Sequence, residues 1–584
     1  MKPVIIAILM LGFPAVTYAT QVSGDVWGVW DSTMNPIEVI GELRVPPDSS
    51  LIIGPGCYIE FQEFYALTVD TSAAFIRAIG TEQDSITFTS AFGRVWNGID
   101  IYLADSACVI SYCIMEKGMA IEGNSGGAIY CISTDLTLNN CSLRNNRAPD
   151  GLGGGIYVGN SNIEIIECEF TENSCGFGGA GLYSSHGNVS VINSLFESDT
   201  TWYPWGGEMA GAIGCQSSQD VVLSGNTFTD NFSGMIGNII MSATATITSN
   251  DFINNSAWHA AGGLILIVED SASVMDNLFE GNWAGTGSGG GLYFRGENSV
   301  ITGNIFIENR VARGGGLYLQ GSYIRVFQNL LAFNIADADG GGVYINGTNM
   351  TLENNVISYN SANGAGGVYS DNSSPFTPIT MINNIVWGNT ATSWPQIYIR
   401  HHPLEVSYCN VQGGWQGVGN IDVDPLFRDI ANGDFHLMST FCGDPYDSPC
   451  IDVGDPAIQD YLLDCDWGLG LQLSDMGAYG GGDSTLQAVE DCQPPLPTEP
   501  ILLQNYPNPF NAATNIEFIL SRRSFLSITI YNILGQEVAI LYRGIRQAGA
   551  HTISWDASDF PSGVYFARLE AGGYTRNIKM LLLK

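Results

Sequence analysis

Short runs of alternating apolar and polar residues recur along most of the chain. At residues 317–319, Leu317 and Leu319 would lie on one face of a strand and Tyr318 on the other. A period of two is typical of β-strands, and the periodicity expected of an amphipathic helix is absent from the sequence. The pattern therefore predicts an all-β protein built from many short strands.

The strands belong to a repeat of roughly 27 residues. Its template is Asn, any residue, an aromatic or aliphatic residue, any two residues and a second Asn, as at residues 226–231, 277–282 and 304–309. The first position of the template falls at Cys113, Cys141, Cys168, Asn193, Asn226, Asn250, Asn277, Asn304, Asn329, Asn355, Asn384 and Cys409. Gly-Gly-x-[Ile/Leu/Val]-Tyr blocks alternate with it and end at Tyr130, Tyr157, Tyr183, Tyr293, Tyr318, Tyr344 and Tyr369.

A unit of this size cannot bury a hydrophobic face by itself, so the repeats must stack. Strands stacked about 4.8 Å apart give a parallel β-helix of about 12 or more coils, with insertions confined to the turns. An Asn at one inward corner of each coil suits a ladder of amide hydrogen bonds, each contributing about 1 kcal/mol net. We expect this ladder to comprise Asn193, Asn226, Asn250, Asn277, Asn304, Asn329, Asn355 and Asn384.

The Gly-Gly-x-Ile/Leu blocks alternate with Phe-x-x-Asn, as at residues 170–173 and 306–309. This pattern resembles the repeats of the chlamydial polymorphic membrane proteins and, more widely, the right-handed parallel β-helix proteins. The resemblance implies an N-terminal cap and first coils over residues 20–110, helix repeats over 111–425 and a closing segment over 426–490. We expect the closing segment to cover the exposed final coil.

A Pro-rich linker over residues 491–500 marks a second boundary. After it, Leu526, Ile528 and Ile530 alternate with polar residues in the manner of a β-sandwich. Motifs at residues 531–536, 548–551, 555–557 and 562–566 resemble the type A C-terminal sorting domain of the type IX secretion system. Over residues 501–584 the resemblance implies an immunoglobulin-like β-sandwich, with the secretion machinery as its partner.

Residues 1–19 have the features of a signal peptide: Lys2, an apolar run over residues 4–13, and Ala19 at the expected cleavage site. Since no later run approaches the roughly 20 apolar residues of a membrane-spanning helix, we expect no transmembrane segment after signal removal. These features predict a secreted or outer-membrane surface protein. The 13 cysteines fit an oxidising compartment. Cys442 with Cys450 and Cys465 with Cys492 are candidate local disulfides, and the sequence leaves the connectivity open.

The formal net charge is −37, and the negative charge lies before residue 500, because basic residues outnumber acidic ones by eight to five after it. A region this acidic repels phosphate backbones and anionic lipids. We therefore expect neither nucleic acid nor a membrane surface as a partner.

The search for catalytic or metal-binding chemistry gives little. No Lys or Arg lies between Arg147 and Arg295, so the central coils cannot supply the basic residue of a polysaccharide lyase. Acids beside the turns are candidates for calcium binding or acid catalysis, although a solvated turn position explains each of them: Asp230, Glu280, Glu308, Asp337 and Asp339. The histidines lack metal-ligand spacing, so no metal site is assigned; no cofactor is expected, and calcium stays an open alternative.

Aromatic residues give the one candidate ligand site. Trp202, Tyr203 and Trp205 lie in the longest repeat, and Trp258 and Trp283 fall in the equivalent turn of later repeats. Aligned aromatic faces suit a sugar ring or a protein partner, although packing onto neighbouring turns would also explain them. The sequence thus favours a non-catalytic, adhesin-like or scaffold protein that binds a polysaccharide or a surface protein. The alternative is a carbohydrate-active enzyme, a hydrolase or lyase, with a carboxylate pair on the helix face.

Overall fold

The chain divides into two compact units, residues 1–482 and 483–584. The computed structural model describes residues 19–69, 73–104, 108–202, 210–371, 379–401, 404–460, 463–465, 468–480, 500–502, 505, 507–520, 524–533, 536–546, 549–558, 560–571 and 574–583. The expected signal peptide before Ala19, the aromatic residues Tyr203 and Trp205, Cys492 and the Pro-rich linker before Pro500 lie outside these ranges.

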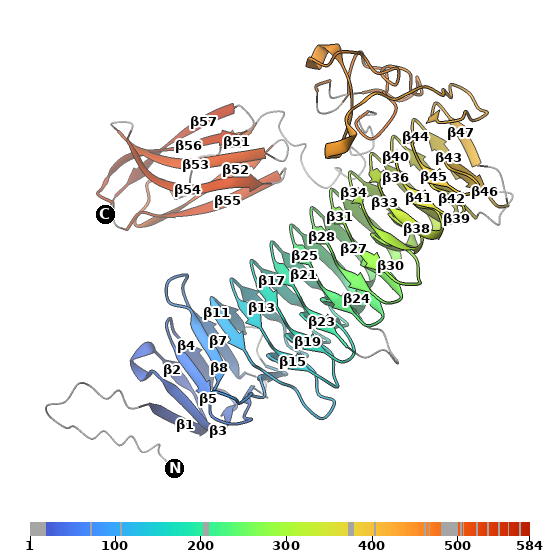
Figure 1. Ribbon diagram of the computed structural model, residues 1–584. Helices are drawn as coiled ribbons and strands as arrows, with labels where there is room; N and C mark the ends of the chain where they lie inside the picture. Colours follow the sequence, from blue (N-terminus) through green and yellow to red (C-terminus); the bar gives the residue numbers. More distant parts are fainter. Residues whose placement is uncertain are drawn as a thin grey trace, which may run out of the picture. The chain divides into compact units, whose positions relative to one another are not determined.

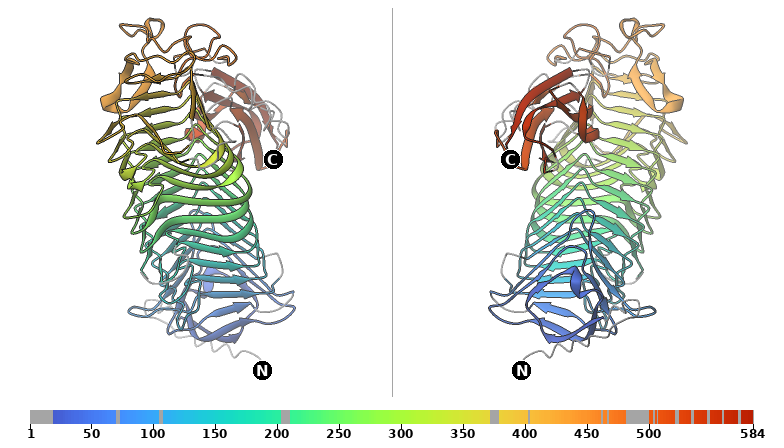
Figure 2. Two further views of the ribbon diagram at one scale, coloured as in Figure 1. Left: turned by 90° about the vertical axis from the view of Figure 1, so that its right-hand side faces the viewer. Right: turned by 90° about the vertical axis from the view of Figure 1, so that its left-hand side faces the viewer.

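The first unit is a β-solenoid of about 14 turns whose strands pair in parallel with the strands one turn before and one turn after (Figure 1). Over residues 129–391 each repeat visits four strips of strands in a fixed order, and the stacked coils confirm the parallel β-helix predicted from the repeat (Figure 2). The first strip carries the tyrosines, the third carries the middle of the Asn template, and the fourth is a separate ten-stranded sheet.

The first strip holds β6 (Leu67–Val69), β9 (Ile99–Tyr102), β12 (Ile129–Ile132), β16 (Ile156–Gly159), β20 (Leu182–Ser185), β42 (Val368–Ser370) and β46 (Ile397–Ile399). The second holds β2 (Gly28–Trp30), β4 (Ser50–Ile53), β7 (Phe75–Ile79), β10 (Val109–Ser111), β13 (Leu136–Asn139), β17 (Ile163–Ile166), β21 (Val189–Ile192), β43 (Ile379–Ile382) and β47 (Leu404–Ser407). Six long strands span both strips: β24 (Ile213–Ser224), β27 (Ile236–Thr248), β30 (Ala260–Met275), β33 (Leu292–Thr302), β36 (Leu317–Phe327) and β39 (Val343–Glu353).

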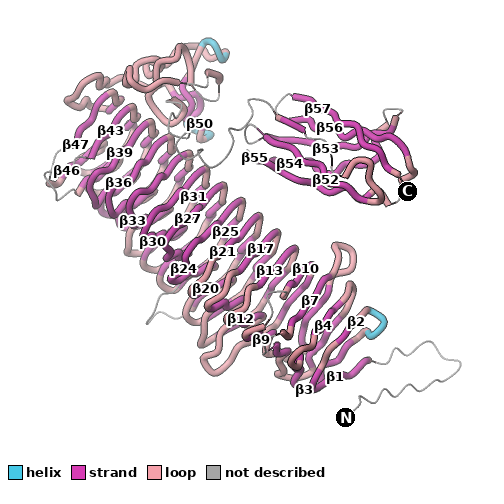
Figure 3. The backbone as a smooth tube through the Cα atoms, turned by 180° about the vertical axis from the view of Figure 1, so that it is seen from behind, coloured by secondary structure: helices cyan, strands magenta, loops and turns pink. Residues whose placement is uncertain are grey.

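The third strip holds β5 (Tyr58–Phe61), β8 (Ile86–Ser90), β11 (Cys113–Glu116), β14 (Ser142–Arg144), β18 (Glu169–Thr171), β22 (Leu195–Glu197), β25 (Thr227–Thr229), β28 (Asp251–Ile253), β31 (Leu278–Glu280), β34 (Ile305–Ile307), β37 (Leu330–Ala332), β40 (Val356–Ser358), β44 (Ile385–Trp387) and β48 (Asn410–Val411). The fourth holds β15 (Arg147–Ala148), β19 (Ser174–Cys175), β23 (Thr200–Thr201), β26 (Phe232–Ser233), β29 (Ser256–Ala257), β32 (Trp283–Ala284), β35 (Arg310–Arg313), β38 (Ile335–Asp339), β41 (Ser361–Ala362) and β45 (Thr390–Ala391). The N-terminal turn adds β1 (Thr20–Asp25), β3 (Ile37–Val45) and the 3-10 helix η1 (Ser32–Met34), which is cyan beside β2 in Figure 3.

The interior of the helix is filled by columns of identical side chains. The aromatic position of the template forms a stack of buried phenylalanines with ring centroids 4.5–4.9 Å apart, close to the spacing of adjacent strands. The stack runs through Phe170, Phe196, Phe228, Phe252, Phe279 and Phe306. A repeated sequence in parallel register therefore places each phenylalanine against its own kind.

Two columns of buried polar residues follow the two ends of the template. In the first, each Asn Nδ2 donates to the Oδ1 of the next Asn at 2.9–3.0 Å, through Asn226, Asn250, Asn277, Asn304, Asn329, Asn355 and Asn384. The second was not predicted: Asn146, Asn173, Asp199, Asn231, Asn255, Asn282, Asn309, Asn334, Asn360 and Asn389.

The expected place of Asn193 in the first column is wrong by one residue. Asn193 is an exposed turn residue with a φ of 49°. Its neighbour Ser194 is buried and donates its backbone N–H to Asn226 Oδ1 at 2.8 Å. The template begins at Ser194 in this coil, because only that register places Phe196 in the phenylalanine stack.

The closing segment lies on the side of the helix and not on its end. It contains β49 (Phe427–Asp429), β50 (Asp434–Leu437) and the short helices η2 (Ile430–Asn432) and η3 (Thr440–Cys442). Its apolar residues form one buried cluster with the outward-facing side chains of β37, β40 and β44, which are Leu330, Ala332, Val356 and Ile385. Outward-facing apolar residues on three successive coils would otherwise be exposed to water, and the closing segment covers them. The expectation that this segment covers the final coil is therefore wrong.

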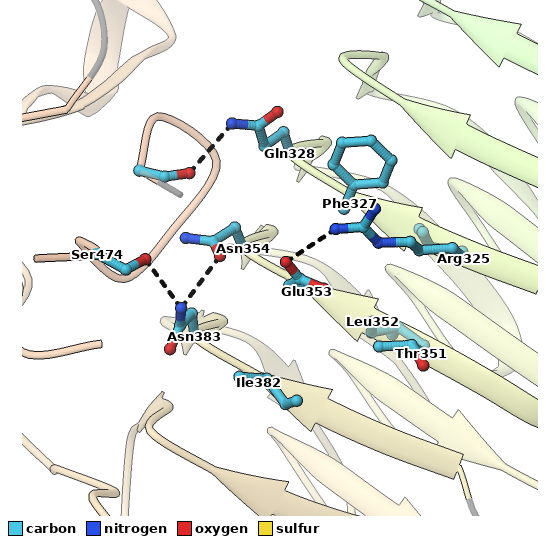
Figure 4. Close-up of polar contacts among 12 residues, drawn as sticks. Arg325, Phe327, Gln328, Thr351, Leu352, Glu353, Asn354, Ile382, Asn383 and Ser474 are labelled. Atoms are coloured by element: carbon cyan, nitrogen blue, oxygen red, sulfur yellow. Dashed lines mark hydrogen bonds and ion pairs between the residues drawn. The ribbon is translucent and has the colours of Figure 1, made fainter. Parts of the chain in front are cut away.

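Hydrogen bonds from the turns before those strands fix the closing segment in place (Figure 4). Asn383 Nδ2 donates to Ser474 Oγ at 2.9 Å. Asn354 Nδ2 donates to the Asp475 carbonyl oxygen at 2.7 Å. The edge of the last coil is met instead by residues 412–423, where the Val411 N–H donates to the Ile421 carbonyl. Residues 412–423 therefore cover the end of the helix, and the closing segment covers its side.

The disulfide pairing also differs from expectation. Cys442 is bonded to Cys465, with the two Cα atoms 5.7 Å apart. Cys450 is a buried thiol that accepts a hydrogen bond from Asn410 Nδ2 at 3.1 Å. Because Cys442 and Cys465 are bonded to each other, the candidate pairs Cys442 with Cys450 and Cys465 with Cys492 are both wrong.

The second unit is a two-layer antiparallel β-sandwich. One sheet has the order β51-β52-β55 and the other β54-β53-β56-β57. The strands are β51 (Ile501–Leu502), β52 (Ala513–Leu520), β53 (Ser524–Asn532), β54 (Glu537–Arg546), β55 (Gly549–Asp556), β56 (Gly563–Ala571) and β57 (Tyr574–Leu582). Trp555, Phe510 and Tyr565 lie in a core between the sheets, as the alternation of residues 526–531 predicts.

Candidate functional site

An aromatic ridge follows four successive coils on the outer face of the fourth strip. We define it by Trp202, Phe232, Trp258 and Trp283. Its three tryptophans are 66%, 51% and 41% exposed, in chain order. Phe232 joins them, with its ring centroid 6.1 Å from that of Trp202 and 6.0 Å from that of Trp258. The rings of Trp202, Phe232 and Trp258 therefore adjoin one another, and Trp283 adds an exposed ring on the following coil.

The short strands of the fourth strip explain why these rings face outward. Ala257 and Ala284 point into the interior and are buried, so the residues on either side of them in the sequence point out. Trp202 and Trp258 occupy the same position two coils apart. Glycines occupy this position in the neighbouring coils, at Gly176, Gly234 and Gly285. At Gly285 a Cβ would overlap the Trp258 carbonyl oxygen, so only glycine fits there.

Phe232 is the ridge residue that the sequence reasoning missed. It follows Asn231 directly, as Trp283 follows Asn282, so the two rings share one register two coils apart. Alignment of the repeats on their second Asn would have found it. Arg310 continues the same position on the next coil and forms an ion pair with Asp337 at 3.0 Å, so the ridge ends beside a charge-balanced pair.

A cluster of charged residues lies at the C-terminal end of the tyrosine column. We call it the charged corner and define it by Arg313, Asp339, Asp371, Arg400 and His401. Asp371 is its hub: Arg400 Nη1 lies 3.2 Å from Oδ2, and His401 Nε2 lies 3.2 Å from Oδ1. The Tyr344 hydroxyl donates to the same carboxylate at 3.3 Å.

The charged corner lies beside the column of stacked tyrosines. Ring centroids of Tyr293, Tyr318, Tyr344 and Tyr369 lie 4.7–5.0 Å apart along the outer face of the first strip. Asp371 and Arg400 each lie two residues beyond a column tyrosine, so period two points them outward beside those rings. Sequence reasoning missed both residues, although their spacing from Tyr369 and Tyr398 is a signal that could have found them.

The remaining acids and histidines are not gathered into a site. Among the described residues, no group of three or more His, Cys, Asp or Glu side chains is placed to hold a metal ion. His436 Nδ1 lies 2.6 Å from Asp434 Oδ1, and its ring stacks on Tyr479 within the closing segment. Within the part of the chain that the structure describes, no helix is long and apolar enough to cross a membrane.

Comparison with known families agrees with this architecture. The model described as a right handed beta helix region matches residues 77–236, 127–288 and 238–395, which together cover more than half of the chain. The chain belongs to the right-handed β-helix family. Residues 504–583 match the secretion system C-terminal sorting domain, the signal of the type IX system. The β-helix protein is therefore secreted or displayed at the cell surface, and its sorting domain interacts with that secretion machinery.

One curated protein is similar to part of this chain. Over 185 residues, 31% of this chain, the β-helix protein is 25% identical to metabotropic glutamate receptor-like protein R of Dictyostelium discoideum. The match covers 11% of that relative. This chain therefore spans about a tenth of the relative's length.

Proposed function

We propose that this β-helix protein binds polysaccharide at the cell surface, along its aromatic ridge. The observation that carries the proposal is the exposure of Trp202, Trp258 and Trp283 on neighbouring coils of one strip. A group of exposed aromatic residues on neighbouring coils is typical of an interaction surface, since large aromatic faces buried in contact contribute strongly to binding.

The geometry of the ridge favours a linear sugar polymer. Coils of a β-helix follow one another at about 4.8 Å, so the ridge presents closely spaced aromatic rings, with 52° between the planes of Trp202 and Phe232 and 78° between those of Phe232 and Trp258. Sugar rings carry apolar C–H faces that stack on such surfaces, and the ridge offers no dense charge that would select a charged ligand. The protein is accordingly an adhesin-like passenger, delivered to its place by the sorting domain and, at the other end, by an N-terminal signal peptide.

The test is retention of the full-length protein on insoluble neutral polysaccharides. A triple variant with Trp202, Trp258 and Trp283 changed to Ala should bind roughly 10- to 1,000-fold more weakly, because each stacked ring contributes about 0.5–1.5 kcal/mol beyond buried area. Trp27→Ala is the matched control, since Trp27 is 57% exposed but lies in the N-terminal turn away from the ridge. Equal retention of the triple variant and the wild type would refute the ridge as the binding surface.

A further inference from the structure

The outer face of the four-stranded sheet in the second unit carries a shallow pocket of about 370 Å³. Its walls come from the neighbouring strands β53, β56 and β57 and from the turn after β53 (Figure 1). Ile530 and Ala567 are buried in the core between the sheets, so period two directs the residues next to them outward. The described residues that line the pocket are Tyr531, Asn532, Ile533, Phe566, Arg568 and Asn577.

One side of the pocket is apolar, although the outer face of an antiparallel sheet is ordinarily polar. Ile533 is 71% exposed and Phe566 is 36% exposed. Tyr531 lies directly opposite Phe566 on the adjacent strand, so their side chains are neighbours. Asn532 Oδ1 accepts the backbone N–H of Gln536 at 3.0 Å, which fixes the turn that carries Ile533. Exposed apolar side chains grouped in this way are typical of an interaction surface.

The other side of the pocket holds a positioned guanidinium group. Arg568 Cζ lies 4.6 Å from the centroid of the Tyr531 ring, and Arg568 Nε donates to Asn577 Oδ1 at 3.1 Å. These two contacts orient the Arg568 side chain before any partner arrives. Binding at the pocket therefore costs little side-chain entropy.

The charge of this surface indicates what it binds. Of the described residues that line the pocket, only Arg568 is charged, and Lys579 lies opposite Phe566 on β57. Basic residues also outnumber acidic ones by eight to five after residue 500, in a chain whose net charge is −37. A guanidinium group beside aromatic walls complements a carboxylate that is next to an apolar side chain.

We infer that this pocket is the docking site for the secretion machinery, and that the machinery inserts a peptide segment with an apolar and an acidic residue. The apolar side chain lies between Ile533 and Phe566, and the carboxylate pairs with Arg568. The inference assigns a surface and a partner chemistry to an interaction that the family of the sorting domain implies only in general. It stands independently of polysaccharide binding, because the ridge belongs to the other unit of the chain.

The experiment expresses the full-length protein in a bacterium that has a type IX system. Immunoblotting for the β-helix gives the ratio of exported to periplasmic protein. Arg568→Glu should lower this ratio at least about 10-fold, because it brings like charges together in the docked complex. Arg568→Gln should also lower it, whereas Arg568→Lys keeps the charge and should restore most of the export. Ile533→Asp should lower the ratio as strongly as Arg568→Glu does, because it removes an apolar contact and adds a repelling charge.

Arg543→Glu is the matched control. Arg543 is an exposed basic residue of the same sheet, on β54, and does not line the pocket. Its charge reversal should change the export ratio less than about twofold, since an isolated surface charge contributes little. A loss of export with Arg543→Glu equal to that with Arg568→Glu would overturn the pocket as the docking site.

Urea unfolding of the purified full-length variants separates a loss of docking from a loss of fold. Arg568→Glu and Ile533→Asp should unfold at the same urea concentration as wild type; if Arg568→Glu unfolds earlier, Ile533→Asp alone decides. All pocket variants should be retained on polysaccharide as wild type is, so a failure of the ridge leaves this inference standing. Wild-type export of Ile533→Asp would overturn the inference, and wild-type export of Arg568→Gln would overturn the acidic partner.

Discussion

Asp199 interrupts the second polar column, where nine other coils have Asn. Its Oδ1 accepts hydrogen bonds from the backbone N–H of Asn173 at 2.8 Å and from Asn173 Nδ2 at 3.1 Å. Its Oδ2 is buried and has no hydrogen-bond partner, although the matching Nδ2 of Asn231 donates to both Phe196 O and Asn255 Oδ1. The column needs a donor at this point, and an ionised carboxylate has none.

Burial therefore raises the pKa of Asp199 to about 8, against the opposing effect of the two Asn173 hydrogen bonds. In the unfolded chain the pKa is about 3.9. Between these values the native protein binds the proton and the unfolded chain does not, so the free energy of unfolding falls by about 1.4 kcal/mol for each pH unit gained. The contribution of Asp199 is present in full below about pH 4 and is lost as the pH rises through about 8.

Asp199→Asn supplies the missing donor and removes the titration. We expect the stability difference, variant minus wild type, to grow by about 2.7 kcal/mol from pH 5 to pH 7 and to level off above about pH 8. The assay is urea unfolding of both proteins across this range, because shared titrations cancel in the difference. Asp230→Asn, at an exposed turn residue of the next coil, is the control. A difference that stays constant from pH 5 to pH 8 would refute this account of Asp199.

Two further changes test the columns and the closing segment. Asn282→Ala removes four hydrogen bonds in the second column, to Phe252 O, Asn309 Oδ1 and the N–H and Nδ2 of Asn255. It should lower the free energy of unfolding by about 2–5 kcal/mol in denaturant titrations, whereas the exposed Asn188→Ala should leave it nearly unchanged. Replacing Cys442 and Cys465 by Ser removes a cross-link between residues 23 apart, worth about 3 kcal/mol for loops of this length. Limited proteolysis within residues 443–464 should become faster while the β-helix strands stay protected; an unchanged cleavage rate would mean that packing alone holds the segment.

The repeat made most of the fold predictable. A 27-residue unit with alternating strands has to stack, and parallel register then brings equal positions together, so Phe279 meets Phe252 and Phe306. The first Asn column followed from the same periodicity. Register within an irregular repeat was less certain: Asn193 and Ser194 are adjacent small polar residues, and only the position of Phe196 shows which of them points inward.

Contacts between segments distant in sequence were beyond reach of the pattern. Leu330, Val356 and Ile385 alternate like other strand residues, and nothing local shows that residues 426–480 return to cover them. The Cys442–Cys465 pairing depends on that return. Asp371 and Arg400, on successive coils, likewise meet only once the coils are stacked.

The sequence by itself determined the all-β class, the stacked coils and the sorting domain, because these depend on local pattern and on repetition at a fixed period. The tertiary structure alone decided which side of the helix the closing segment covers, which cysteines are bonded and which charged groups share a corner. These features depend on how far each coil is rotated and where outward apolar surface is left to bury, and a one-dimensional period specifies neither.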